Sequence, residues 1–252
     1  MNVPDYAVLL VQITAFFLVA SVSALTTYGT LNSKFSNARE PYIAWSIGLF
    51  SLAWLVIVLV TSYSNVLVPQ MDDVVPYLGV FIAGSTILVA ALVLYIPNMR
   101  QIMNSVPISW FAGIQIYRVI GAVFLLLEAD GLLSKYFAVT TAWGDIFVGL
   151  TAPIVAVLLH RDLYKYLWVG ILWSLIGIGD LILVLFKAIQ SAPGPRQTTA
   201  FDIPTEVVTY FPFSILPMLI VPVSIILHLI LIQKLLAVRN NDAPKKAPVT
   251  SK

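Results

Sequence analysis

Residues 110–131 read WFAGIQIYRVIGAVFLLLEADG, an apolar run with one arginine, Arg118, near its centre. A helix needs about 20 apolar residues to cross the roughly 30 Å hydrocarbon core of a bilayer, and this run is long enough. An unpaired arginine at that depth costs at least about 2.5–3.5 kcal/mol. The sequence therefore predicts a transmembrane helix whose cation is neutralised inside a bundle.

The rest of the chain has the same apolar character. Of its 252 residues 60% are hydrophobic and 10% are charged, with a mean hydropathy of +0.94, whereas soluble domains carry about 25% charged residues. Seven runs are long enough to span a bilayer, at roughly 6–30, 42–63, 75–96, 107–127, 137–159, 166–189 and 212–236. The expected fold is an all-α integral membrane bundle of seven transmembrane helices over residues 1–238. The polar segment 239–252 is expected to be a disordered cytoplasmic tail.

Basic residues are sorted between the two sides of this predicted bundle. Ten of the 14 fall on one side, namely Lys34, Arg39, Arg100, Arg161, Lys165, Lys234, Arg239, Lys245, Lys246 and Lys252. Lys135, Lys187 and Arg196 fall on the other, and the last is Arg118. The positive-inside rule therefore predicts an N-terminus outside and a C-terminus in the cytoplasm. Basic residues sorted in this way do not form a nucleic-acid-binding patch, so the predicted partner is the lipid bilayer, and no protein partner is indicated.

Two aspartates share the predicted depth of Arg118. Asp145 lies eight residues after the start of its span, while Arg118 and Asp180 each lie nine residues before the ends of theirs. At about 1.5 Å per helical residue, all three are roughly 12–14 Å beneath the outer surface. The planar guanidinium can bind two carboxylates and does not escape by deprotonating. We therefore predict that Arg118 pairs with Asp145, Asp180 or both.

Other side chains are predicted to line the same site. Gln115 precedes Arg118 by one helical turn, which would let it help satisfy the guanidinium, and Trp143 and Trp173 flank the two aspartate-bearing segments.

His228 in the last span is a candidate relay, or a side chain bonded to a carbonyl that a nearby proline frees. Its position, roughly 24 Å from the outer surface, predicts that it lies outside the charge cluster. The chain has no cysteine, which excludes disulfides, thiolate chemistry and cysteine-based metal sites, and no cofactor or metal is predicted.

Residues 177–180 read GIGD, which resembles the GxGD signature of intramembrane aspartyl proteases, the presenilin, signal peptide peptidase and prepilin peptidase group. The resemblance implies a catalytic pair in which Asp180 and Asp145 share a proton and activate water. The sequence departs from that pattern: the second aspartate follows Trp-Gly where the family has Tyr, seven spans are predicted where presenilin-type enzymes have nine, and LPML at 216–219 replaces Pro-Ala-Leu. Arg118 would also keep the carboxylates ionised.

Three further segments carry a second resemblance: IQIYRVIGAVFL at 114–125, WGDIFVGLTAP at 143–153 and VPVSIILHLILIQKL at 221–235. Over roughly the C-terminal 60% of the chain, the sequence resembles a group of uncharacterised prokaryotic membrane proteins with several spans. The resemblance implies the plasma membrane of a prokaryote and implies no activity.

The function predicted from these residues is binding of a small solute, proton or ion for transport or sensing. Buried ionisable residues in spans are candidates for such sites. Two alternatives stay open: a structural or accessory subunit in which the ion pairs only fix the helices, and the aspartyl protease. Enzymatic activity is therefore left undecided by the sequence.

Overall fold

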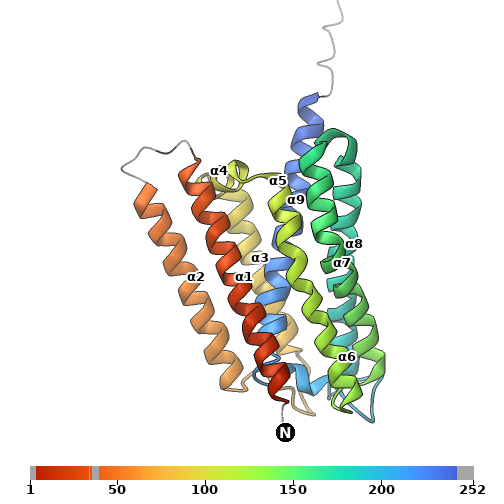
Figure 1. Ribbon diagram of the computed structural model, residues 1–252. Helices are drawn as coiled ribbons and strands as arrows, with labels where there is room; N and C mark the ends of the chain where they lie inside the picture. Colours follow the sequence, from red (N-terminus) through yellow and green to blue (C-terminus); the bar gives the residue numbers. More distant parts are fainter. Residues whose placement is uncertain (1–3, 34, 36–39, 243–252) are drawn as a thin grey trace, which may run out of the picture.

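The computed structural model of the protein describes residues 4–33, 35 and 40–242, and helices account for nearly all of its regular structure (Figure 1). In chain order they are α1 (Asp5–Leu31), α2 (Glu40–Tyr63), α3 (Tyr77–Tyr95), α4 (Pro97–Ser105), α5 (Ile108–Gly113), η1 (Ile114–Gly121), α6 (Ala122–Ala129), α7 (Lys135–Arg161), α8 (Leu163–Ser191), η2 (Thr205–Thr209), η3 (Leu216–Ile220) and α9 (Val221–Asp242). The described ranges contain no strand and seven helical segments long and apolar enough to cross a membrane. The predicted seven-span all-α fold is confirmed.

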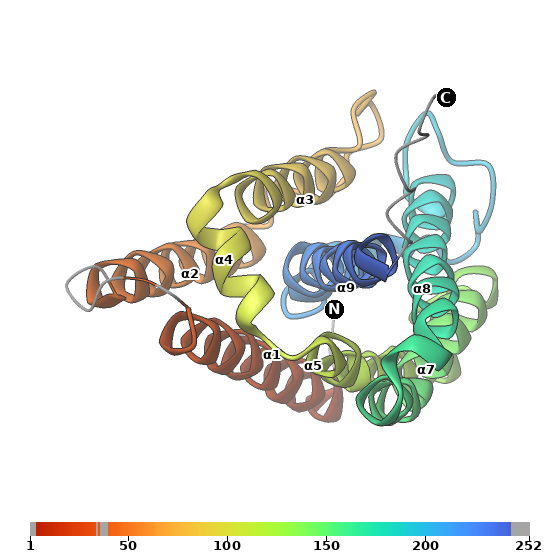
Figure 2. The same ribbon diagram turned by 90° about the horizontal axis from the view of Figure 1, so that it is seen from above.

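The last span, η3 with α9, lies at the centre of the bundle, with α1 to α3 on one side and α7 and α8 on the other (Figure 2). In an apolar stretch of 18 residues within this span, 61% of the residues are buried. In the corresponding stretches of α2 and α3 only 11% are buried. Because the apolar surfaces of α2 and α3 remain exposed, those helices present most of their side chains to lipid. The central span and the one containing Arg118 therefore form most of the interior.

The fourth span is continuous from Ile108 to Ala129 but changes its winding in the middle. Segment η1 is a 3-10 helix, in which residues three apart lie on the same side. Gln115, Arg118 and Gly121 are three apart and all buried. This winding directs all three toward the other helices of the interior.

The last span begins later than the sequence predicts, at Leu216 and not at residue 212. The preceding residues are apolar because they are buried in turns: Phe213 and Ser214 are buried, and the Ser214 hydroxyl lies 2.5 Å from that of Ser62 in α2. An apolar residue is expected to be buried, but it can be buried in a turn as well as in a helix. The apolar pattern therefore predicts the start of the last span too early. At the other end α9 continues to Asp242, and residues 243–252 of the predicted tail lie outside the described residues.

The short helix α4 is not predicted by the pattern of apolar runs in the sequence. It follows α3 directly, and its residues Ile102 and Met103 are buried against the bundle. Its end is held by Lys234 of α9, whose Nζ donates to the carbonyls of Met103 at 2.7 Å, Asn104 at 2.9 Å and Val106 at 2.7 Å. Carbonyls at a helix C-terminus have no partner within the helix. Lys234, which the sequence analysis counts among the basic residues of one side, is therefore a buried cap for α4.

Replacing Lys234 with methionine is expected to lower the free energy of unfolding by about 1–2 kcal/mol, because three carbonyls lose their donor while the side-chain volume is kept. The measurement is thermal or denaturant unfolding of purified protein in detergent. Lys165→Met, at an exposed position, is the matched control and is expected to change little. Equal effects of the two substitutions would contradict the capping role.

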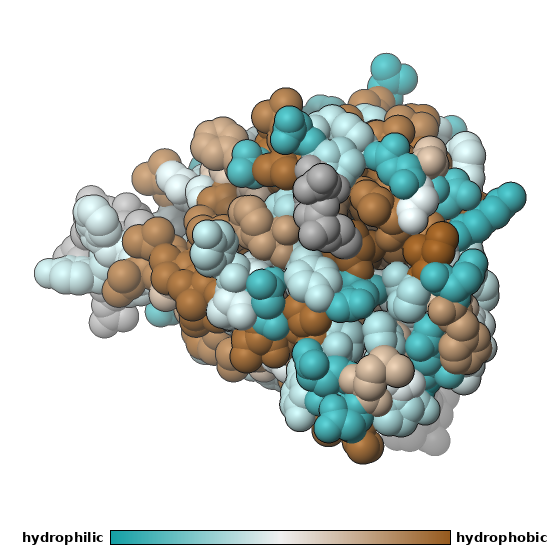
Figure 3. Space-filling model, turned by 90° about the horizontal axis from the view of Figure 1, so that it is seen from below, coloured by the Kyte–Doolittle hydropathy of each residue, from teal (hydrophilic) through white to brown (hydrophobic). Residues whose placement is uncertain are grey.

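One end of the bundle is closed by a long connection. Figure 3 views this end, at which α1 begins, and shows hydrophilic side chains mixed with hydrophobic ones on that face. The long connection from Ser191 to Leu216 closes this end, because Thr198 and Thr199 donate their backbone N–H groups to the Gln190 carbonyl and Val207 of η2 is buried. The connection is therefore a packed part of the structure, and it walls one end of the site described below.

Candidate functional site

Arg118 binds both aspartates, as the sequence predicts. Its Nε donates to Asp145 Oδ1 at 2.7 Å, its Nη2 donates to Asp180 Oδ2, and its Nη1 donates to the Gly177 carbonyl at 3.2 Å. The arginine side chain is fully buried, and the aspartates keep 14% and 10% of their side-chain surface exposed. Three different spans are thus joined at one level of the membrane.

The charges of this cluster do not balance. Nε and Nη2 lie on the same edge of a guanidinium, so Asp145 and Asp180 lie side by side along that edge. No second basic side chain in the described part of the chain forms an ion pair with either. One guanidinium and two ionised carboxylates leave one excess negative charge. In a poorly hydrated interior such a charge is stabilised by a proton or a cation.

Glycines give the charged side chains room. A Cβ atom at Gly144 would overlap the carboxylate of Asp180, and one at Gly121 would overlap the side chain of Asp145. At Gly149 a Cβ would lie 2.6 Å from the backbone nitrogen of Val119, in the arginine-bearing segment. Gly144 and Gly149 let α7 approach its neighbours closely enough for the ion pairs to form, which is a common role of small residues between membrane helices.

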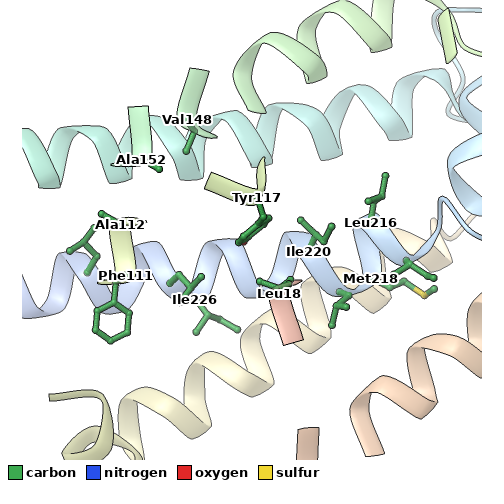
Figure 4. Close-up of a cluster of buried hydrophobic side chains, with 14 of the residues drawn as sticks. Leu18, Phe111, Ala112, Tyr117, Val148, Ala152, Leu216, Met218, Ile220 and Ile226 are labelled. Carbon is green, nitrogen blue, oxygen red and sulfur yellow. The ribbon is translucent and has the colours of Figure 1, made fainter. Parts of the chain in front are cut away.

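Gln115 lies next to the cluster but binds elsewhere. Its Nε2 donates to the Ser224 carbonyl of α9 at 3.0 Å, and its Oε1 has no hydrogen-bond partner in the described residues. Tyr117 also points toward α9 (Figure 4), where its hydroxyl lies 2.6 Å from the Ser224 hydroxyl. The expectation that Gln115 helps satisfy the guanidinium is therefore wrong: it and Tyr117 attach η1 to the central helix. Sequence reasoning does not select Tyr117, because tyrosines in spans are usually interfacial.

His228 lies beside the charge cluster, and the prediction that it lies apart from it is wrong. A Cβ at Gly177 would overlap the histidine Nε2, and the carbonyl of the same glycine binds Arg118. The last span starts at Leu216, 12 residues before His228, which places the histidine about 18 Å along the axis instead of 24 Å. Both ring nitrogens lack hydrogen-bond partners among the described residues, and the ring meets Trp173 edge-on with centroids 5.0 Å apart.

The two tryptophans predicted to wall the site point in different directions. Trp173 is buried, contacts His228 and donates its Nε1 proton to Thr151 Oγ1 at 2.8 Å. Trp143 is 60% exposed, on the outer face of α7. Residues 143 and 145 are two apart, about 200° around an α-helix, so an inward Asp145 directs Trp143 outward. Trp143 is therefore not part of the site.

A cavity reaches the charge cluster at Asp145. It encloses about 1200 Å³, counting the open space at its mouth, and lies among α3, α6, α7, α8 and the start of the last span. Its walls are mostly aliphatic and aromatic, including Phe124, Leu181 and Ile220. Pockets for small molecules commonly combine apolar walls with a few polar groups. Asp145 and Thr141, on neighbouring turns of α7, are polar residues of the transmembrane helices that line it.

The chain matches a protein family over a region that contains all of these site residues. Residues 75–236, well over half of the chain, match a family described as a domain of unknown function, DUF8737. The chain belongs to this family. The match covers α3 through most of α9, and hence the charge cluster, His228 and most of the cavity wall. No curated protein and no solved structure matches the chain.

The family membership agrees with the resemblance to uncharacterised membrane proteins and supplies no activity. Among the described residues, no group of three or more His, Asp or Glu side chains is arranged to hold a metal ion. Arg118, Asp145, Asp180 and the neighbouring His228 offer ion pairing, proton binding and hydrogen bonding.

Proposed function

We propose that the protein binds a proton or a small cation at Arg118, Asp145 and Asp180 and uses this binding for transport or sensing across a membrane. The observation that carries the proposal is the excess of one carboxylate over the single guanidinium in a buried cluster. The cavity that ends at Asp145 supports it, because an ion site needs access. A coupled solute would reach the cluster by the same route.

The proposed orientation follows from the charges at the two ends of the bundle. Arg161 and Lys165 lie at the junction of α7 and α8, and Arg239 lies in the last turns of α9, at the end where α4 is found (Figure 1). We assign this end to the cytoplasm and the N-terminus to the outside. The connections that line the cavity then lie on the outer side of a plasma membrane, which the resemblance makes that of a prokaryote.

His228 extends the proposed site toward the cytoplasmic end. It is fully buried, its nitrogens have no partner in the described residues, and it packs against the glycine whose carbonyl binds Arg118. A neutral imidazole can accept one proton and donate another. We assign it the role of a relay between the cluster and the last turns of α9.

The test of the proposal is proton uptake by the purified protein. As the pH falls, the wild-type protein is expected to gain one protonated carboxyl group in the cluster, because one proton removes the excess charge. Infrared difference spectroscopy detects this group by its carbonyl stretch. Asp180→Asn, which balances the cluster at one cation and one anion, is expected to abolish that band.

The exposed residue Asp130 provides the control, since its carboxylate binds the Tyr6 hydroxyl at 2.6 Å and takes no part in the ion pairs of the cluster. Asp130→Asn is expected to leave the band intact. Identical infrared differences in the wild type and in Asp180→Asn would rule out proton binding by the cluster. Flux of protons or cations into liposomes carrying the protein then separates transport from sensing.

A structural role is the second candidate, favoured by the three internal acceptors that satisfy the arginine. In that case Asp145→Asn and Asp180→Asn would change only stability, and neither proton uptake nor flux would depend on them. The protease alternative has less support, because one oxygen of each carboxylate is bound by Arg118, whereas a catalytic pair shares a proton and holds a water molecule. Cleavage of a reporter helix that is lost in Asp180→Asn would revive it.

A further inference from the structure

The cavity at Asp145 has a polar inner end and apolar walls. The second oxygen of Asp145 has no hydrogen-bond partner in the described part of the chain, and the side chain retains 14% of its surface while lining the cavity. Four residues earlier in α7, Thr141 also lines the cavity, and its buried hydroxyl lacks a hydrogen-bond partner among the described residues. Residues four apart share a helix face. The inner end therefore presents two unused oxygen acceptors on one face of α7.

The charge along the cavity is concentrated at that inner end. Asp73 and Arg196 line the cavity near the connections, carry opposite charges and are both held by the chain: Asp73 accepts the Gln70 backbone N–H at 2.8 Å, and Arg196 donates to the Val74 carbonyl. Asp145 belongs to the cluster with the excess negative charge. A molecule that fills the cavity thus contacts mostly apolar side chains and, at Asp145, a negative hydrogen-bond acceptor.

We propose that the cavity binds an apolar primary amine in its protonated form, with the ammonium group at Asp145 and Thr141 and the hydrocarbon portion between α3 and α8. A primary ammonium has three N–H donors, enough for the two acceptors described above. Its positive charge neutralises the cluster, and its chain replaces water along the apolar walls. This inference rests on the proposed function, because it names the class of cation that the unbalanced cluster takes.

Three ligands of equal chain length test the charge requirement: octylammonium, octanol and octanoate. Binding to the purified full chain in a nonionic detergent is measured by titration calorimetry. Octylammonium is expected to bind at least about tenfold more tightly than octanol, the gain from one charge-assisted hydrogen bond, and octanoate more weakly than both. Equal affinities for octylammonium and octanol would overturn the proposal.

Two glycines of α3 provide matched variants for the location. A Cβ at Gly79, which lines the cavity, would lie 3.6 Å from Ile189 Cδ1 of α8, whereas a Cβ at Gly84 would meet nothing within 4 Å. Gly79→Phe places a ring in the cavity and is expected to weaken octylammonium and octanol binding equally, at least about tenfold. Gly84→Phe, the same substitution on the exposed side of the same helix, is expected to leave both affinities unchanged. Binding that survives Gly79→Phe would overturn the assignment to this cavity.

Two polar substitutions test the inner end. Asp145→Asn is expected to bring octylammonium affinity down to that of octanol, and Thr141→Val, which keeps the side-chain shape, is expected to weaken octylammonium binding severalfold without affecting octanol. Should Asp145→Asn fail to fold, Thr141→Val and the glycine pair still decide the question. Proton uptake without a preference for octylammonium would defeat this inference alone, whereas the absence of both proton uptake and cation binding would defeat the proposed function.

Discussion

Replacing Arg118 with methionine is expected to destabilise the protein by about 3–5 kcal/mol, the usual cost of removing one partner from a buried ion pair. The substitution keeps most of the side-chain volume and leaves two carboxylates side by side in an apolar interior. Their repulsion and lost hydration both favour the unfolded chain. The measurement is the yield of monodisperse protein after extraction, followed by thermal unfolding in detergent.

The control for this prediction removes the orphaned charges as well. The triple variant Arg118→Met, Asp145→Asn, Asp180→Asn has no net charge in the cluster and is expected to recover most of the lost stability, because neutral amides can bond to each other. Replacing a whole buried network is often close to neutral. If the single and triple variants were equally unstable, packing of the arginine and not its charge would hold the three spans together.

Replacing Gly149 with leucine is expected to cost about 3 kcal/mol or more, at the upper end of the range for overpacked interiors. The first added atom alone would lie 2.6 Å from the Val119 backbone nitrogen and 3.1 Å from the Arg118 carbonyl carbon. Backbone cannot rotate out of the way as a side chain can, so α7 must move away from η1. That movement would also lengthen the ion pair to Asp145, and unfolding in detergent measures the combined effect.

The matched control is Gly179→Leu in α8, one residue from Asp180. Nothing lies within 4 Å of a Cβ at this exposed position, and leucine is a better helix former than glycine by up to about 1 kcal/mol. The control variant is expected to be as stable as the wild type or slightly more stable. A similar loss in both variants would show that the glycines act through helix flexibility and not through close packing.

Part of the site can be predicted from the sequence because charge in a membrane is costly. Arg118, Asp145 and Asp180 stand out from apolar surroundings, and their positions along three spans predict matching depths, so their meeting is expected and is confirmed. The predicted depth of His228 is wrong because it depends on the start of the last span. There Phe213 and Ser214 lie in a turn that precedes the helix, so composition alone misplaces the boundary.

The contacts of the side chains cannot be predicted in the same way. Helical periodicity directs Trp143, two residues before Asp145, outward and places Trp173, seven residues before Asp180, on the aspartate face. It does not predict the contact of Trp173 with His228. The sequence does not single out Thr141 or Tyr117 as site residues. A hydroxyl group in a span indicates such a role only when its hydrogen-bond partner, or the lack of one, is known. The capping of α4 by Lys234 joins residues more than a hundred positions apart.

The amino-acid sequence alone is enough to predict that the chain has seven membrane-spanning segments and that a guanidinium and two carboxylates meet inside the bundle. Both conclusions follow from the free energy of placing polar groups in hydrocarbon, which depends on composition and depth. The packing of the helices, in contrast, sets which span is central, which residues face the cavity and where Asp145 is accessible. Lipid and protein interior are similarly apolar, so a membrane helix that is apolar on every side does not reveal which of its faces packs inward.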